Sequence, residues 1–116
     1  MPRVTLKSRL PQIAASIRPR VGAAVKQAAE AVAEDARQRV PLGPPSVHIK
    51  DHIRVERREA AGYHVIADAE DPQGRPYAAY VEFGTNNRAA TPFLIPALEA
   101  NAENAENLVR AALRGL

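Results

Sequence analysis

The sequence predicts an α+β fold in which a long N-terminal helix packs on a small antiparallel sheet of about three to four strands, followed by a C-terminal helix. Three observations predict it. They are a long alanine-rich segment with apolar residues every three or four positions, a central segment of alternating apolar and polar residues, and a second helical pattern near the end. The 116 residues fit one domain, which we expect to span residues 1–116, with residues 1–9 as a flexible basic arm.

The first helix is predicted over residues 10–40. Its apolar residues share one stripe, because side chains three or four positions apart lie on the same face of a helix. Pro19 removes a backbone hydrogen bond, so the helix either kinks there or begins again at this residue. Pro41 ends the helix, and residues 41–46 form a proline-rich loop. The stripe consists of Leu10, Ile13, Ile17, Val21, Ala24, Ala28, Val32 and Ala36.

Three strands are predicted next. Residues 53–59 and 63–68 alternate apolar and polar side chains, and Ala60–Gly62 is the expected hairpin turn between them. Asp71–Gly74 has proline and glycine where a tight β-turn needs them. The third strand is predicted at Tyr77–Phe83, where Tyr77, Ala79, Val81 and Phe83 would face one way and Ala78, Tyr80 and Glu82 the other.

The last helix is predicted from Pro92 or Pro96 to Leu113, after a turn-rich loop at Gly84–Arg88. Proline and Glu99 in its first turn suit the positive end of the helix dipole, and basic residues suit its other end. Phe83 and Phe93 are both expected in the core. The apolar stripe of this helix is narrow and consists of Leu94, Leu98, Ala105, Val109 and Ala112.

The composition argues against catalysis, and we expect a non-enzymatic protein with no cofactor and no metal. Without cysteine there is no disulfide, thiolate metal site or Cys nucleophile. Neither a Gly-x-Ser-x-Gly elbow nor a Gly-rich phosphate loop is present. His48 and His52 have the spacing of a helical metal pair, but their neighbours predict no stable helix, so surface histidines are expected. No apolar run is long enough to cross a membrane.

The net charge of +3 is unevenly distributed along the chain. Residues 1–30 carry six basic residues and one acidic residue, a balance of +5, whereas residues 61–116 carry four and seven, a balance of −3. Arg18, Arg20 and Lys26 are therefore candidates for contact with DNA phosphates or an acidic partner. A solvated helix face is the alternative. Interleaved aromatic residues and a helix-turn-helix are missing, so base-specific recognition is not expected.

Two motifs carry a resemblance to a known family. They are Tyr80–Thr85 (YVEFGT) and Pro92–Leu98 (PFLIPAL), preceded by Val40-Pro41 at the end of the first helix and by Ile49–Ile53 (IKDHI). Together they resemble the small head–tail joining, or tail-completion (neck), proteins of long-tailed bacteriophages, over about residues 10–113. Relatives often carry Thr-Gly-x-Leu after the Val-Pro, whereas this chain has LGPPSVH, so no partner contact of that loop is carried over.

The resemblance implies a structural subunit of an oligomeric ring, expected to be a hexamer, that joins the head connector to the tail or completes the tail. Implied partners are further copies of the chain, the neighbouring connector or stopper, and tail terminator or tail-tube proteins, with nonspecific contact to DNA in the lumen. The implied location is the virion neck, assembled in the host bacterial cytoplasm. A tail terminator ring capping the tail tube is the alternative, and a nonspecific DNA-binding module is the alternative of another class.

A ring subunit uses head-to-tail contacts and therefore needs two different complementary patches. An aromatic residue with a polar tip beside a carboxylate is typical of a contact surface. We therefore expect one patch at Tyr80, Glu82, Gly84, Thr85 and Arg88, and the other on the long helix or on residues 41–47.

Overall fold

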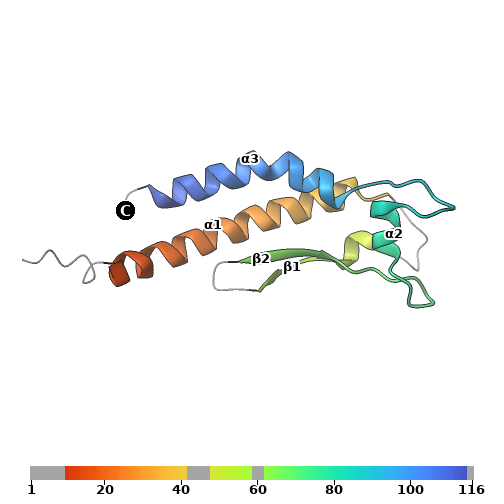
Figure 1. The fold of residues 1–116 in the computed structure, drawn as a ribbon, viewed down its shortest axis with the longest axis horizontal. Coiled ribbons are helices and arrows are strands. Elements are labelled where there is room, and N and C mark those ends of the chain that lie inside the picture. The colour runs from red at the N-terminus through yellow and green to blue at the C-terminus, as the bar shows by residue number, and fades with distance from the viewer. Residues whose placement is uncertain (1–9, 42–47, 59–61, 115–116) are drawn as a thin grey trace, which may run out of the picture.

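The computed structural model describes residues 10–41, 48–58 and 62–114 of the chain. It has the predicted α+β class: a long helix, a two-stranded antiparallel sheet and a C-terminal helix. In Figure 1 the long helix α1 (Leu10–Arg39) runs between the C-terminal helix α3 (Leu94–Leu113) and the β-hairpin. The expected arm at residues 1–9 and the loop at residues 42–47 lie outside the described residues.

Helix α1 confirms the first predicted element. It runs without interruption through Pro19 for 30 residues, so the helix does not begin again at that proline. Among the buried residues at positions 15–39, where side chains are described, Val32 is accompanied only by small ones: Gly22, Ala24, Ala28, Ala33 and Ala36. Side chains this small let neighbouring elements approach the helix closely, but each contributes little buried area. The described core is correspondingly thin.

The sheet is a single hairpin, with fewer strands than predicted. Strand β1 (Ile53–Arg57) pairs antiparallel with β2 (Tyr63–Ala67) in a register that places Ile53 opposite Ala67 and Val55 opposite Val65. The Arg58 N–H donates to the Gly62 carbonyl at 3.1 Å and closes the hairpin, although residues 59–61 of the predicted turn lie outside the described residues. A short 3-10 helix (Ile49–His52) leads into β1 and buries Ile49.

The third predicted strand is wrong, because Tyr77–Phe83 forms the short helix α2. Its buried residues Ala78, Val81 and Glu82 are three and four positions apart, which is the spacing of one helical face and not of a strand. Phe83, expected in the core, is 71% exposed. The error follows from the assumed spacing of side chains on one face, which is two residues in a strand and 3.6 residues in a helix. Residues that would alternate between the two faces of a strand are distributed around the helix instead.

Helix α3 confirms the last predicted element and packs antiparallel beside α1 (Figure 1). The Asn101 amide donates to Asp35 Oδ2 at 2.7 Å, and the Arg20 guanidinium donates to the Arg114 carbonyl at 3.4 Å, which sets the register of the pair. Phe93, just before α3, is 1% exposed and confirms its predicted core position. Glu99, however, lies in the second turn and not in the first.

Two of the predicted turns, at Asp71–Gly74 and at Gly84–Arg88, lie within the described residues and are present. At Asp71–Gly74 the Gly74 N–H donates to the Asp71 carbonyl at 2.9 Å. At Gly84–Arg88 the chain forms an isolated antiparallel bridge between Thr85 and Arg88. No helix in the described part of the chain is both long enough and apolar enough to span a membrane.

Candidate functional site

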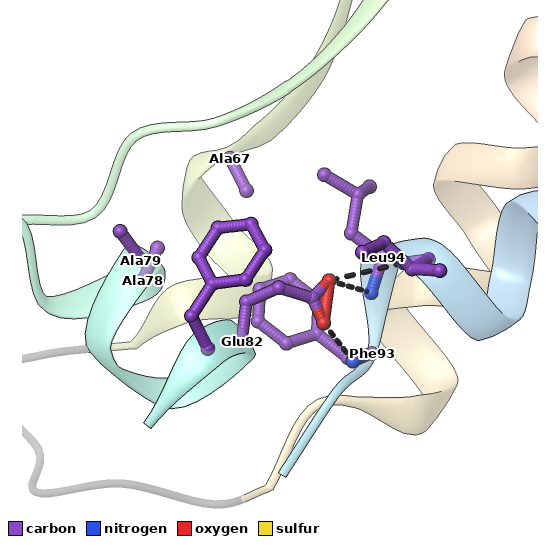
Figure 2. A pocket seen from close by; sticks show the side chains of 8 residues that line it. Ala67, Ala78, Ala79, Glu82, Phe93 and Leu94 are labelled. Atoms are coloured by element: carbon purple, nitrogen blue, oxygen red, sulfur yellow. Dashed lines mark hydrogen bonds between the residues drawn. The ribbon is translucent and has the colours of Figure 1, made fainter. Parts of the chain in front are cut away.

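The candidate site is the end of the molecule where α2, the loop after it and the start of α3 meet. At its centre lies Glu82, whose side chain comes from the inner face of α2 and is 5% exposed. Its Oε2 accepts a hydrogen bond from the Phe93 N–H at 2.9 Å, and its Oε1 accepts from the Leu94 and Ile95 N–H groups at 2.8 and 3.0 Å (Figure 2).

These three bonds make Glu82 the N-terminal cap of α3. The first N–H groups of a helix have no partner within the helix, and they form its positive end. A carboxylate placed against them satisfies the donors and balances the partial charge. The acidic group that the sequence analysis assigned to Glu99 is therefore supplied by Glu82 from another helix. Glu82 does not share an exposed face with Tyr80.

The chain turns away from α2 at Gly84, whose φ is +77°. A Cβ at this position would lie 2.9 Å from the Ala90 nitrogen and 3.0 Å from the Arg88 carbonyl oxygen. Both atoms are backbone atoms, so only glycine fits there without a shift of the chain. The Thr91 N–H also donates to the Val81 carbonyl at 2.8 Å, so the loop folds back tightly onto α2.

The loop is held by contacts to its own residues and to Tyr77. The Thr85 N–H donates to the Arg88 carbonyl at 2.9 Å, and Thr85 Oγ1 accepts from the Asn87 N–H at 3.3 Å. Arg88 donates to the Tyr77 hydroxyl at 3.0 Å, with its guanidinium carbon 5.4 Å from the centre of that ring. This is a cation–π contact, and it fixes an exposed cation in place.

Of the five predicted contact residues, the structure brings four together near one surface. Thr85 and Arg88 are exposed, while Tyr80 and Gly84 are half-buried. Glu82 lies beneath them. The sequence analysis missed two residues here: Tyr77, which holds Arg88, and Phe83, which points outward. No sequence signal indicated the role of Tyr77, because its partner is 11 positions away.

An apolar patch, made up of Phe83, Ile95 and Leu98, lies at the same end of the molecule. These side chains are 71%, 45% and 59% exposed. Phe83 and Ile95 line a cleft of about 140 Å³, whose other lining residues include Ala79, Phe93 and Leu94 (Figure 2). The spacing of Ile95 and Leu98 in the PFLIPAL motif could have indicated a shared helical face.

The basic residues Arg18, Arg20 and Lys26 lie within the first 17 of the 30 residues of α1 and are all exposed. The structure does not bring them to the α2 end. His48 and His52 are exposed as expected, and within residues 10–41, 48–58 and 62–114 no three His, Cys, Asp or Glu side chains gather as a metal site.

The clear shifts in pKa among the described carboxylates have structural causes. Hydrogen bonds from the backbone and side chain of Arg75 lower the pKa of Asp71, and the backbone bond is the largest cause. A hydrogen bond from Arg39 lowers the pKa of Asp35 on α1, and a bond from Arg54 lowers that of Glu56 on β1. These groups belong to a turn and to surface ion pairs within the chain.

Comparison with known proteins identifies the family. No match was found among curated proteins or among solved structures. A family model described as "Bacteriophage HK97-gp10, putative tail-component" matches residues 5–84, which is more than half of the chain. The match covers α1, both strands and α2, and it ends at Gly84, before α3. It agrees with the resemblance that the sequence motifs indicated. The chain therefore belongs to the HK97-gp10-like family of bacteriophage tail components.

Proposed function

We propose that this chain is a structural subunit of a bacteriophage neck. Copies of it form a ring, expected to contain six, that joins the head connector to the tail or completes the tail. Membership of a tail-component family supports a role among phage structural proteins. The observation that carries the proposal is the exposed apolar patch beside a rigid loop at the α2 end.

The patch is costly for a protein that works alone. Burying one large apolar side chain stabilises a contact by about 1.5–3 kcal/mol relative to leaving it in water. Phe83, Ile95 and Leu98 all keep 45% or more of their surface exposed in this chain. Exposed apolar groups gathered in this way are typical of a surface that another protein covers. A ring neighbour would supply that cover.

The loop beside the patch is organised before any partner arrives. Arg88 is held on Tyr77, and Gly84 and Thr85 are fixed by backbone contacts. A rigid contact surface loses little conformational freedom on binding, so more of its contact energy appears as affinity. We therefore assign the first contact patch to Tyr80, Gly84, Thr85 and Arg88 together with Phe83. In this assignment Glu82 supports the patch from beneath, by holding α3 against α2.

The proposed role needs no cofactor and no catalysis. Its partners are further copies of the chain, the neighbouring connector or stopper, and tail terminator or tail-tube proteins. Its place is the neck of the virion, after assembly in the host bacterial cytoplasm. A tail terminator ring would have the same kind of contact surface and differs only in its position on the tube.

Electron microscopy of negatively stained samples tests this function. The purified full-length protein would be imaged alone and with isolated tail tubes. We expect rings of one symmetry at the head-proximal end of the tubes, and the protein in purified particles. A strictly monomeric protein that is absent from the particles would contradict the proposal, and a ring that caps the tube without reaching the connector would identify a terminator.

Nonspecific DNA binding is the second candidate, favoured by the exposed Arg18, Arg20 and Lys26. If these side chains face the lumen, they contact DNA phosphates as the genome passes. Binding to duplex DNA would then fall steeply as salt rises, because released counterions drive such contacts. Phosphate contacts are still strong at about 50 mM salt, so absence of binding there would remove this candidate. The matched variant, Arg18→Gln/Arg20→Gln/Lys26→Gln, tests whether these three side chains make the contact.

A further inference from the structure

An apolar groove runs along α1 where it meets β2 and α3. Val25, Ala29 and Val32 line it from α1, Tyr63 from β2, and Leu94 and Leu98 from α3, around a space of about 310 Å³. Leu94 also lines the cleft beside Phe83, so the groove continues the apolar patch described above. A groove of this kind fits the apolar face of a helix.

The exposed charges on the two long helices have opposite signs and are separated into two runs. Between Leu10 and Ala29 the charged residues of α1 are all basic: Arg18, Arg20 and Lys26. Between Leu94 and Val109 the charged residues of α3 are all acidic: Glu99, Glu103 and Glu106. All six are exposed. We call the first set the basic run and the second set the acidic run.

The two runs lie at different heights along the helix pair. The contacts between Asp35 and Asn101 and between Arg20 and Arg114 set the antiparallel register, which places Glu103 level with the stretch around residue 32 of α1. The basic run is centred about eleven residues closer to the start of α1, which is about 16 Å along the axis.

The separation of the two centres exceeds the Debye length of about 8 Å at physiological salt, so Arg18, Glu99 and Glu103 are not neutralised by the opposite run within one subunit. Lys26 and Glu106 are the exception, because the register places them within about 6 Å of each other along the axis. Among the described residues, neither Arg18 nor Lys26 has an ion-pair partner, and the same holds for Glu99 and Glu103. These four side chains are therefore available to a neighbouring molecule, whereas Arg20 donates to the Arg114 carbonyl and Glu106 pairs with Arg110.

We propose that residues 17–26 of α1 in one copy dock head to tail along the groove of the next copy, with the basic run against that copy's acidic run. A neighbour displaced by about 16 Å along the helix axis brings the two runs level. Its half-buried Ile17 and Val21 continue the line of Val25 at steps of four residues, so the same face supplies apolar side chains to the groove.

The proposal rests on the ring function, because a ring joins each subunit to its neighbours through two different surfaces. The receiving side is the groove with the acidic run, and it continues the apolar patch beside the first contact patch. The inserting side is the segment of residues 17–26 of α1, which is the second surface that the ring requires.

Charge reversal tests the proposal on the full-length protein. The base-reversed variant is Arg18→Glu/Lys26→Glu, and the acid-reversed variant is Glu99→Lys/Glu103→Lys. All four side chains are exposed, so circular dichroism should show unchanged folding. Lys50→Glu and Glu70→Lys, which are exposed elsewhere, are the matched controls. Assembly would be followed by sedimentation velocity across protein concentration, at about 50 and 500 mM salt, because salt screens these contacts.

We expect each reversed variant alone to assemble about tenfold more weakly or worse, since attraction between exposed pairs becomes repulsion. An equimolar mixture of the two variants should recover assembly, because each inserting run then meets an opposite charge. A chain carrying all four changes should recover it as well, and the two controls should match the wild type.

The assignment is overturned if the reversed variants assemble like the wild type, if the mixture stays unassembled, or if the wild type forms only a closed dimer. The first two outcomes with a wild-type ring would leave the ring function standing. A wild type that never self-associates and is absent from phage particles would overturn the ring function and the docking together.

Discussion

Glu82 is predicted to be the most sensitive charged position of the described fold. The perturbation is Glu82→Gln, which keeps the size of the side chain but replaces one carboxylate oxygen by an NH₂ group. The carboxylate accepts three backbone N–H bonds at the start of α3, from Phe93, Leu94 and Ile95. In the variant, the NH₂ group cannot accept, so at least one of these donors loses its partner.

The magnitude follows from those contacts. A buried donor left without a partner costs about 1–3 kcal/mol. Loss of the negative charge at the positive end of α3 costs about 0.3–1 kcal/mol more. Together these effects predict a loss of about 1–4 kcal/mol in the free energy of unfolding, from a total of about 5–15 kcal/mol for a typical domain. The midpoint of thermal unfolding should fall by about 5–16 °C for a chain of this size.

Urea denaturation followed by circular dichroism at 222 nm measures this loss. The midpoint should fall while the slope stays the same, which indicates a change in stability and not in exposed surface. Glu103→Gln is the matched control, because Glu103 is exposed on the same helix, and it should change the stability by no more than about 0.5 kcal/mol. If Glu82→Gln were as mild as this control, Glu82 would not be the cap of α3.

Four further predictions follow from individual contacts. Tyr80→Ala should impair ring assembly while circular dichroism shows a folded subunit, and normal rings would remove Tyr80 from the first contact patch. Phe93→Ala should cost about 3–5 kcal/mol in stability, because Phe93 is 1% exposed. Phe83→Ala should leave the stability almost unchanged and weaken assembly measured by sedimentation, because Phe83 is 71% exposed. Similar losses of stability in both variants would contradict this contrast. Gly84→Ala should destabilise the fold by about 1–3 kcal/mol in urea titrations, since a Cβ there meets the backbone at a positive φ, and a neutral result would contradict the close approach. The pKa of Asp71 is lowered in the folded state, chiefly by the hydrogen bond from the Arg75 N–H. The stabilisation by the Asp71 carboxylate is therefore present above the ordinary pKa of 3.8 and is lost as the pH falls below it. Asp71→Asn should make stability fall less steeply at acidic pH, and an unchanged pH dependence would argue against this bond.

The two long helices and the hairpin could be predicted because local patterns extend over enough residues. In α1, eight apolar positions repeat at helical spacing among alanines, and no strand could bury them on one face. Alternation in residues 53–57 and 63–67 likewise specified two strands. The family resemblance was also readable, because it depends on residue types at fixed spacing, and the family match confirms it.

The candidate site was chosen from residues that the sequence singled out, but their burial and contacts required the structure. Tyr77–Phe83 is seven residues long, and over that length apolar positions fit a strand as well as a helix. In the structure it also contacts distant residues, above all through the bonds that the N–H groups of residues 93–95 donate to Glu82. The error in period placed Glu82 outside and Phe83 inside, which is the reverse of their positions.

The uneven distribution of charge along the chain was visible in the sequence, and the charged residues on each helix could be counted from it. Whether opposite charges meet within one molecule depends on the register of α1 against α3, which the contacts of Asp35 and Arg20 determine. Sequence by itself thus determined which segments become helices and strands, because backbone propensity and periodicity act locally. Only the tertiary structure decided which side chains are left for a neighbour, because burial depends on residues far apart in the chain.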